Sequence, residues 1–298
     1  MKLPLFLLTL GAIANGSAVV ASATSPVPVK DGLVLHLDAA DQAAARQRVS
    51  LPPAANMRPV DQWLDSSGGG LAAAQQAAAS RPVFRTDGTE AFVRFDGQDD
   101  FLPITGPRRL TPAMTVFVLA APRGNPGGFS ALFSTAESGK NDYTSGLNLD
   151  LGPLATKQLS VLNVESAGCT GFRDLLEPAK NLAAELPFEG FHVLTVRSKI
   201  GEKGNQLFLD SILLGDRLRM ESNIGLDQMN IGARLCSNDP GEPPFAQGFF
   251  QGDLAAVLVY NRALDDAEIT KVEEYLFART PALNALASGP WLANGTAA

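Results

Sequence analysis

Two acidic side chains in this 298-residue sequence are spaced so that they could form the carboxylate pair of a glycoside hydrolase. Asp150 follows Asn148 in the alternating stretch GLNLDLG, and Glu165 follows Asn163 in QLSVLNVES. Alternate residues of a strand lie on one face, so each carboxylate shares a polar face with an asparagine. If the two strands are neighbours, the carboxyl groups come within the separation that glycoside hydrolysis requires. The simpler interpretation, which we prefer from sequence, is a solvated polar face without catalytic function.

A loop between strands offers groups of the kind that bind sugars. The stretch ESGKNDYTSG, residues 137–146, carries amide, carboxylate and phenol groups, and Phe172 or Phe245 would provide an apolar platform beside it. Loops of this composition also occur simply as turns. Together with the two strand asparagines, the predicted ligand-binding residues are Asn141, Asp142, Tyr143, Asn148 and Asn163.

Aspartates in two glycine-containing turns are candidates for a structural calcium site. Asp65 lies in WLDSSGGG, and Asp96 and Asp99 lie in FDGQDD. Carboxylate oxygens are ligands that Ca²⁺ prefers, although the spacing matches no EF-hand loop. The alternative is turn chemistry, in which aspartate accepts hydrogen bonds from nearby backbone amides. Structural calcium is the one cofactor that the sequence suggests.

The two cysteines, Cys169 and Cys236, are predicted to form a disulfide, with free thiols as the alternative. Both lie in stretches that look like loops, and an exported protein meets an oxidising compartment. The sequence has only two histidines, His36 and His192, so a four-ligand zinc site would need carboxylates.

The N-terminus has the pattern of a secretion signal. It carries one cation at Lys2, an apolar stretch to about Ala14, and an A-x-A pattern at residues 21–23. We expect a signal peptide over residues 1–23 and a mature protein that is secreted, at the cell surface or in the periplasm. An uncleaved anchor is the alternative. No later stretch approaches the ~20 apolar residues that a membrane span requires.

The charge balance limits the partners. The sequence has 24 Lys and Arg against 31 Asp and Glu, a formal net charge of −7. Nucleic acid and anionic lipid need concentrated positive charge, so neither is expected as a partner. A polysaccharide or another extracellular protein fits better.

Short apolar stretches separated by Gly, Pro, Asn and Asp predict an antiparallel sandwich or barrel. Residues 32–39 and 146–152 alternate, whereas residues 113–122 are almost continuously apolar, as in a strand deep in a sheet.

One helix is predicted near the C-terminus. Asp265 and Glu268 have the spacing of a capping box, and Pro281 is expected to end the helix. Residues 281–298 are then expected to form a mobile C-terminal tail.

The order of these segments is similar to that of bacterial laminin-G-like, concanavalin A-like lectin/glucanase domains. The stretches that carry the resemblance are DGLVLHLDAAD, WLDSSGGGLAAAQQAAASRPVF, FVRFDGQDDFLPI, LTPAMTVFVLAAP and FFQGDLAAVLVYNRALDDAEITKVEEYL. The resemblance implies an all-β, concanavalin A-like jelly-roll sandwich of two antiparallel sheets with a short C-terminal helix, in one domain over residues 24–280.

The resemblance also bears on function. Glucanases that this chain resembles carry an E-x-D-x-x-E strand, and this sequence has no such spacing. Lyases of similar fold need a basic groove, which the acidic composition does not favour. We therefore expect a secreted, non-catalytic domain that binds a glycan or a protein. The alternatives are a glycoside hydrolase or lyase that uses Asp150 and Glu165, and a purely structural module.

Overall fold

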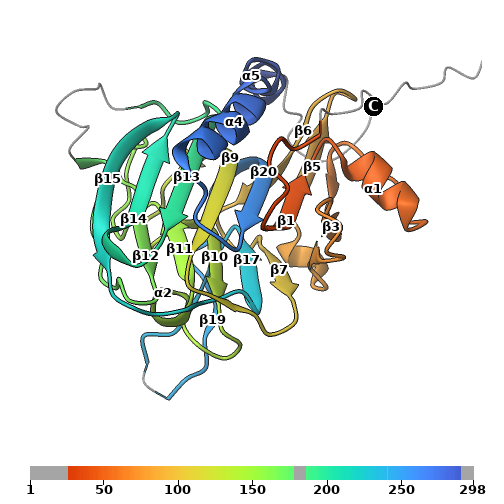
Figure 1. The fold of residues 1–298 in the computed structure, drawn as a ribbon. Coiled ribbons are helices and arrows are strands. Elements are labelled where there is room, and N and C mark those ends of the chain that lie inside the picture. The colour runs from red at the N-terminus through yellow and green to blue at the C-terminus, as the bar shows by residue number, and fades with distance from the viewer. Residues whose placement is uncertain (1–25, 178–185, 240, 290–298) are drawn as a thin grey trace, which may run out of the picture.

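The computed structural model describes residues 26–177, 186–239 and 241–289, and it shows a β-sandwich with a layer of helices on one side (Figure 1). The predicted signal peptide, residues 1–23, lies outside the described residues. Among these residues the larger sheet has, in spatial order, β15 (Ile212–Arg219), β14 (Gly201–Leu209), β13 (His192–Ser198), β9 (Met114–Gly124), β20 (Gln251–Tyr260), β6 (Ala91–Asp96), β5 (Val83–Thr86) and β2 (Arg58–Pro59), with β1 (Leu33–Asp38) also paired to β20.

The smaller sheet packs against the larger one and is also antiparallel. Its strands, in spatial order, are β12 (Asn163–Ser166), β11 (Leu147–Asp150), β10 (Ala131–Ala136), β17 (Gln228–Ile231) and β7 (Leu102–Thr105). Three short pairs lie outside both sheets: β16 (Ile224–Gly225) with β8 (Leu110–Thr111), β18 (Arg234–Cys236) with β19 (Phe245–Gln247), and β3 (Gln62–Leu64) with β4 (Ala72–Ala74). The predicted all-β jelly-roll sandwich of two antiparallel sheets is therefore confirmed.

Apolar side chains from both sheets fill the space between them. Alternation in β11 turns Leu147 and Leu149 into this core, where Phe133 of β10 is also fully buried. Trp63, from the turn that carries the family resemblance, is buried in the same cluster. The smaller sheet therefore gives one face to the core and leaves its polar face for a site.

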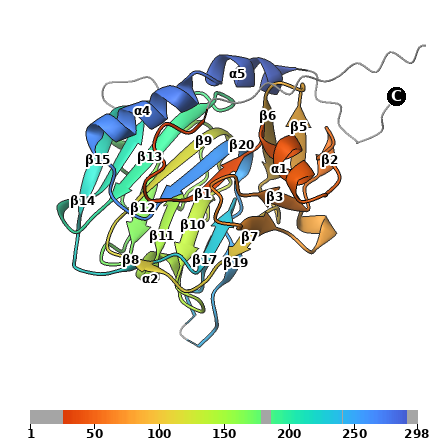
Figure 2. The same cartoon turned by 45° about the vertical axis from the view of Figure 1, so that its right-hand side comes forward.

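Helices cover the other face of the larger sheet (Figure 2). Helix α4 (Asp266–Phe277) begins at Asp265 with the predicted capping box. Its buried residues join a second apolar cluster that includes Phe117 of β9 and Leu258 of β20. Strands β9 and β20 are thus apolar on both faces, which explains the continuous apolar run in the sequence. In the described part of the chain the remaining helical segments are α1 (Gln42–Arg48), η1 (Ala78–Ser80), α2 (Asp142–Ser145) and α5 (Thr280–Ser288).

The prediction of a C-terminal tail from residue 281 is wrong for residues 281–288. These residues belong to helix α5, and Leu283 and Leu286 are buried in the helix-covered cluster. Pro281 does not simply end the preceding helix, because it stands in the first turn of the next one, where its missing N–H has no partner to lose. Residues 290–298 lie outside the described residues. No helix in the described part of the chain is long and apolar enough to cross a membrane.

The predicted disulfide is also wrong, because Cys169 and Cys236 are both free and buried. Cys169 lies near Asn205 and Arg217, whereas Cys236 lies on β18 beside Asp142 and Arg234. Burial raises the pKa of both thiols, that of Cys236 to about 12. Each cysteine therefore behaves as a small buried side chain rather than as a reactive thiolate.

Candidate functional site

The polar face of the smaller sheet carries the two predicted carboxylates. Strands β11 and β12 are direct neighbours, with Asn148 opposite Glu165 and Asp150 opposite Asn163. Ser134 of β10 stands opposite Asn148, which extends the polar row across the sheet. The two strands are therefore neighbours, as the hypothesis of a carboxylate pair required, and both carboxylates lie on one face of the sheet.

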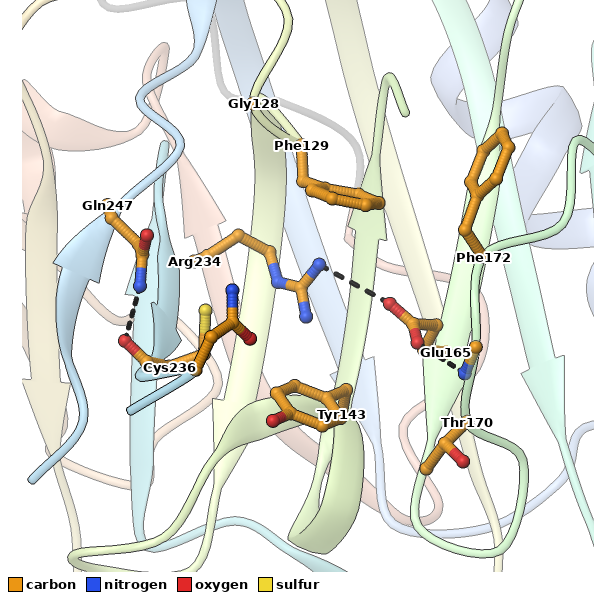
Figure 3. A pocket seen from close by; sticks show the side chains of 11 residues that line it. Gly128, Phe129, Tyr143, Glu165, Thr170, Phe172, Arg234, Cys236 and Gln247 are labelled. Atoms are coloured by element: carbon orange, nitrogen blue, oxygen red, sulfur yellow. Dashed lines mark hydrogen bonds and ion pairs between the residues drawn. The ribbon is translucent and has the colours of Figure 1, made fainter. Parts of the chain in front are cut away.

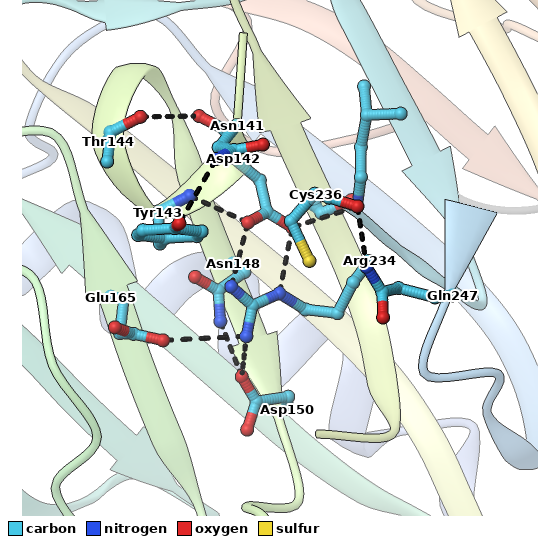
Figure 4. A network of polar contacts seen from close by, with 12 residues as sticks. Asn141, Asp142, Tyr143, Thr144, Asn148, Asp150, Glu165, Arg234, Cys236 and Gln247 are labelled. Carbon is cyan, nitrogen blue, oxygen red and sulfur yellow. Dashed lines mark hydrogen bonds and ion pairs between the residues drawn. The ribbon is translucent and has the colours of Figure 1, made fainter. Parts of the chain in front are cut away.

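The β18–β19 hairpin is fixed over this face by polar side chains of the sheet. Ser134 Oγ donates a hydrogen bond of 2.8 Å to the carbonyl of Ala233, and Asn230 Nδ2 donates one of 3.3 Å to the carbonyl of Arg234. These bonds hold the backbone where the Arg234 side chain begins. That side chain then extends across the carboxylates of β11 and β12 (Figure 4).

Arg234 is the centre of a buried ion-pair network. Its Nε and Nη2 donate to the two oxygens of Asp142, both at 2.8 Å, in a bidentate pair. Its Nη1 donates to Asp150 at 3.1 Å and to Glu165 at 3.4 Å. The residue is only 3% exposed, so the three carboxylates replace the water that a guanidinium would otherwise need.

The loop that carries Asp142 is tied to the same hairpin. Asn141 Nδ2 donates to the carbonyl of Ser237, and Asn141 Oδ1 accepts from the backbone amide of Ser237. Asp142 Oδ2 also accepts from the backbone amide of Leu235 at 2.9 Å. The loop and the hairpin therefore form one unit around Arg234.

Both oxygens of Asp150 accept hydrogen bonds within the protein. Its Oδ1 accepts from the backbone amide of Gly152, and its Oδ2 accepts from Asn148, Asn163 and Arg234. The residue is fully buried, and burial raises its pKa to about 6 although Arg234 acts in the opposite direction. The neighbouring Asn148 keeps an unpartnered acceptor, because its buried Oδ1 accepts no hydrogen bond from the described residues.

A pocket of about 280 Å³ opens beside this network (Figure 3). Phe129 and Phe172 meet edge to face at its wall, with ring centroids 6.0 Å apart, and Phe172 remains 44% exposed. The Arg234 guanidinium lies 5.6 Å from the Phe129 ring centre and 5.7 Å from that of Tyr143. The pocket is lined by Gly128, Phe129, Tyr143, Glu165, Thr170, Gly171, Phe172, Arg234, Cys236, Asn238 and Gln247.

Phe129 reaches its position through an uncommon backbone conformation. Its φ is 60°, in the left-handed region that bulky residues rarely adopt. Gly127, with a φ of 87°, leaves no room for a Cβ, which would lie 2.9 Å from the backbone nitrogen of Ala155. Asn125 holds the loop, since its Oδ1 accepts from the amide of Gly127 and its Nδ2 donates to Leu151 and Leu154. The loop thus places the Phe129 ring on Arg234.

The structure brings the predicted site residues together, in two layers. Tyr143 and Glu165 line the pocket, and of the two predicted platforms only Phe172 does so. The others form the network beneath it: Asn141, Asp142, Asn148, Asp150 and Asn163. Sequence reasoning missed Arg234 and Phe129. The signal for Arg234 was a lone cation in the short stretch ARLC next to a strand, and for Phe129 it was the preceding glycine pair.

The predicted calcium ligands fall into two places. Asp96 and Asp99 lie close together with Asp100 in the turn after β6. Asp65 does not belong to this group. Its carboxylate instead accepts hydrogen bonds from the backbone amides of His36 and Ser67. Burial and the charge of Asp96 raise the pKa of Asp100 to about 7. Calcium binding at this turn stays a prediction from sequence.

Comparison with solved structures finds other sandwich domains at low identity. A Trypanosoma rangeli sialidase in complex with the inhibitor DANA is 14% identical with a TM-score of 0.47, over 85% of this chain and 35% of that chain. The receptor-binding domain of botulinum neurotoxin type G is 10% identical with a TM-score of 0.47, over 84% of this chain and 52% of that chain. Domain 4 of an extracellular arabinanase from Geobacillus stearothermophilus, in complex with arabinotriose, is 12% identical with a TM-score of 0.44, over 81% of this chain and 98% of that chain.

The chain therefore spans about a third to a half of the first two of these proteins. No protein-family model and no curated protein matches the sequence. At these identities and TM-scores the comparisons support no inference about a ligand or a reaction.

Replacing Arg234 tests the network. Arg234→Met is expected to lower the free energy of unfolding by about 3–5 kcal/mol, because it leaves three carboxylates without their cation. The loss is expected to shrink as the pH falls, since carboxyl protonation removes the uncompensated charge. Urea denaturation at pH 8 and pH 5 measures both effects. The matched control is Arg108→Met, whose side chain is 78% exposed and should change stability by less than about 0.5 kcal/mol.

The raised pKa of Asp100 predicts that the folding stability of the protein, kept free of calcium with EDTA, depends on pH in an unusual way. The pKa of Asp100 in the folded chain, about 7, exceeds the ordinary value of 3.8, so between these values the folded state binds more protons than the unfolded state. Stability is therefore expected to rise as the pH falls from 8 to 5. Asp100→Asn removes this charge and is expected to stabilise the protein by roughly 1–2 kcal/mol at pH 8 and by less at pH 5.

Thermal unfolding across this pH range checks the prediction, with the exposed Asp239→Asn as control. An equal gain at both pH values would contradict the assignment to Asp100. The same series with Ca²⁺ tests the calcium prediction, because a bound cation would keep Asp100 ionised and remove its contribution to the rise in stability at lower pH.

Proposed function

We propose that this protein is an exported, non-catalytic domain that binds a glycan in the pocket between the β18–β19 hairpin and the Phe129 and Phe172 loops. The observation that carries the proposal is the pocket itself, in which aromatic rings stand beside polar side chains over a rigid floor. Export rests on the N-terminal signal pattern, and an extracellular protein partner is the alternative ligand.

The chemistry of the pocket suits a sugar. Phe172 offers an exposed apolar ring on which the C–H face of a pyranose can pack. Asn238 and Gln247 also line the pocket and offer amide groups to hydroxyls, and Gln247 lies on the side opposite Phe172 in Figure 3. Gln247 Nε2 donates to the carbonyl of Cys236, and the Phe172 ring packs edge to face on Phe129, so both side chains are held before a ligand arrives. This lowers the conformational entropy cost of binding.

The same network argues against catalysis by the acid pair. A general acid or nucleophile needs an oxygen that reaches the substrate. Asp150 is fully buried and both of its oxygens accept hydrogen bonds, so it does not reach a ligand. Glu165 lines the pocket, but its Oε1 accepts from the Gly171 amide at 2.6 Å, its Oε2 faces Arg234, and no second carboxylate is among the described residues that line the pocket. We therefore assign both carboxylates to holding Arg234 rather than to a glycoside hydrolase or lyase reaction.

Removing the exposed ring tests the binding site. Phe172→Ala is expected to weaken glycan binding about tenfold, because it removes a stacking contact worth about 1–1.5 kcal/mol. Phe245→Ala is the matched control, since Phe245 is 55% exposed but does not line the pocket. Binding is measured first on a glycan array and then by calorimetry. Failure to bind any glycan, with or without Ca²⁺, would contradict the proposal.

Turnover assays test the absence of catalysis. The wild-type protein is expected to release no reducing ends and no unsaturated products from the glycans that it binds. Turnover that disappears in an Asp150→Asn, Glu165→Gln double variant would instead show an enzyme that uses the acid pair. The folded state of the double variant is checked by circular dichroism.

A further inference from the structure

We infer that the pocket selects sugars that donate hydrogen bonds, neutral or amine-bearing, and rejects glycans that carry a carboxylate or sulfate. This inference rests on the proposed function and specifies its ligand class. It follows from the state of the cation at the base of the pocket.

The positive charge of Arg234 is already neutralised by carboxylates of the protein, so it does not attract an anionic ligand. Arg234 is the only cationic side chain among the described residues that line the pocket. All three of its guanidinium nitrogens donate to carboxylates, and the pair with Asp142 is bidentate. An acidic sugar would have to displace one of these buried carboxylates, which would then lose its own partner.

The charge balance of the network is negative. Three carboxylates, those of Asp142, Asp150 and Glu165, surround one guanidinium. The Glu165 contact is the longest of the three at 3.4 Å, and Glu165 is also the carboxylate that lines the pocket. The least compensated charge is therefore the one that meets the ligand, and it repels an anion.

Two basic side chains near the pocket, Arg217 and Arg173, do not neutralise the negative charge at the pocket wall. Arg217 donates to the carbonyls of Val164, Thr170 and Gly171, and is not among the residues that line the pocket. Arg173 is exposed, and its backbone amide donates to Asn163. Both side chains remain outside the pocket lining.

The pocket wall offers an acceptor. Glu165 lines the pocket, and its Oε2 has only long contacts within the protein, 3.4 Å to Arg234 and 3.5 Å to Asn163. This carboxylate favours a ligand, or a ligand-bound water, that donates a hydrogen bond. Hydroxyl and ammonium groups can do so, whereas a carboxylate or sulfate cannot.

A glycan array with matched chemical forms tests the inference. Each glycan is printed as its neutral, N-deacetylated, carboxylated and sulfated forms. We expect the acidic forms to bind the wild-type protein about tenfold more weakly than their neutral parents, and added salt to narrow this difference by screening. The deacetylated forms are expected to bind at least as well as the neutral ones.

A charge variant assigns the selectivity to the pocket. Glu165→Gln is expected to raise the ratio of acidic to neutral binding severalfold, whatever its effect on total affinity. Glu274→Gln is the matched control, since Glu274 is exposed on helix α4, on the helix-covered side of the larger sheet. If Glu165→Gln does not fold, the salt dependence of the wild-type ratio still tests whether the selectivity is electrostatic.

The outcomes separate the two proposals. Stronger binding of acidic than of neutral forms would overturn the charge selectivity while leaving a glycan-binding function in place. A ratio that neither salt nor Glu165→Gln changes would also overturn it. No binding to any form would overturn the proposed function itself, and the selectivity with it.

Discussion

The buried guanidinium of Arg234 is the constraint on which the site depends. A cation that is removed from water must find its counter-charges within the protein, and Arg234 finds three. These come from helix α2 and from strands β11 and β12, while the arginine itself comes from the β18–β19 hairpin. One side chain therefore fixes three segments that are distant in sequence from its own hairpin, and the polar face of the smaller sheet becomes a rigid floor.

The layered fold explains why the site lies on this face. Helices α4 and α5 cover the outer face of the larger sheet, so its central strands are apolar on both sides. Within the described residues no such helices cover the smaller sheet, and its outer face carries Ser134, Asn148 and Asn230 in one row. The hairpin supplies bonding partners for Ser134 and Asn230, and Asn148 donates to Asp150 within the sheet, which offsets the cost of burying these polar groups.

Local patterns in the sequence predicted the polar strand face and the capped helix. The features that they did not predict depend on contacts between residues far apart in the sequence. The period of two placed Asn148 and Asp150 on one face, and the capping box at Asp265 placed helix α4. The predicted disulfide was wrong because the flanking sequences do not show that each cysteine is buried among different partners, Cys169 near Asn205 and Cys236 near Asp142. The predicted C-terminal tail was wrong because the docking of Leu283 and Leu286 on a sheet that is distant in sequence leaves no local pattern. The role of Arg234 was missed for the same reason, since its partners are spread over three other segments of the chain.

A raised carboxyl pKa in a pocket region often marks catalysis, but the bonding pattern decides how the shift is interpreted. Burial raises the pKa of Asp150 to about 6, a value that would suit a general acid. Yet both oxygens of the buried Asp150 accept hydrogen bonds: Oδ1 accepts from the Gly152 amide, and Oδ2 accepts from Asn163 and Arg234. The features that suggested an active site in the sequence are therefore those that stabilise Arg234. At the pocket they leave the Glu165 carboxylate near the exposed ring of Phe172, and the proposed glycan binding rests on that pair.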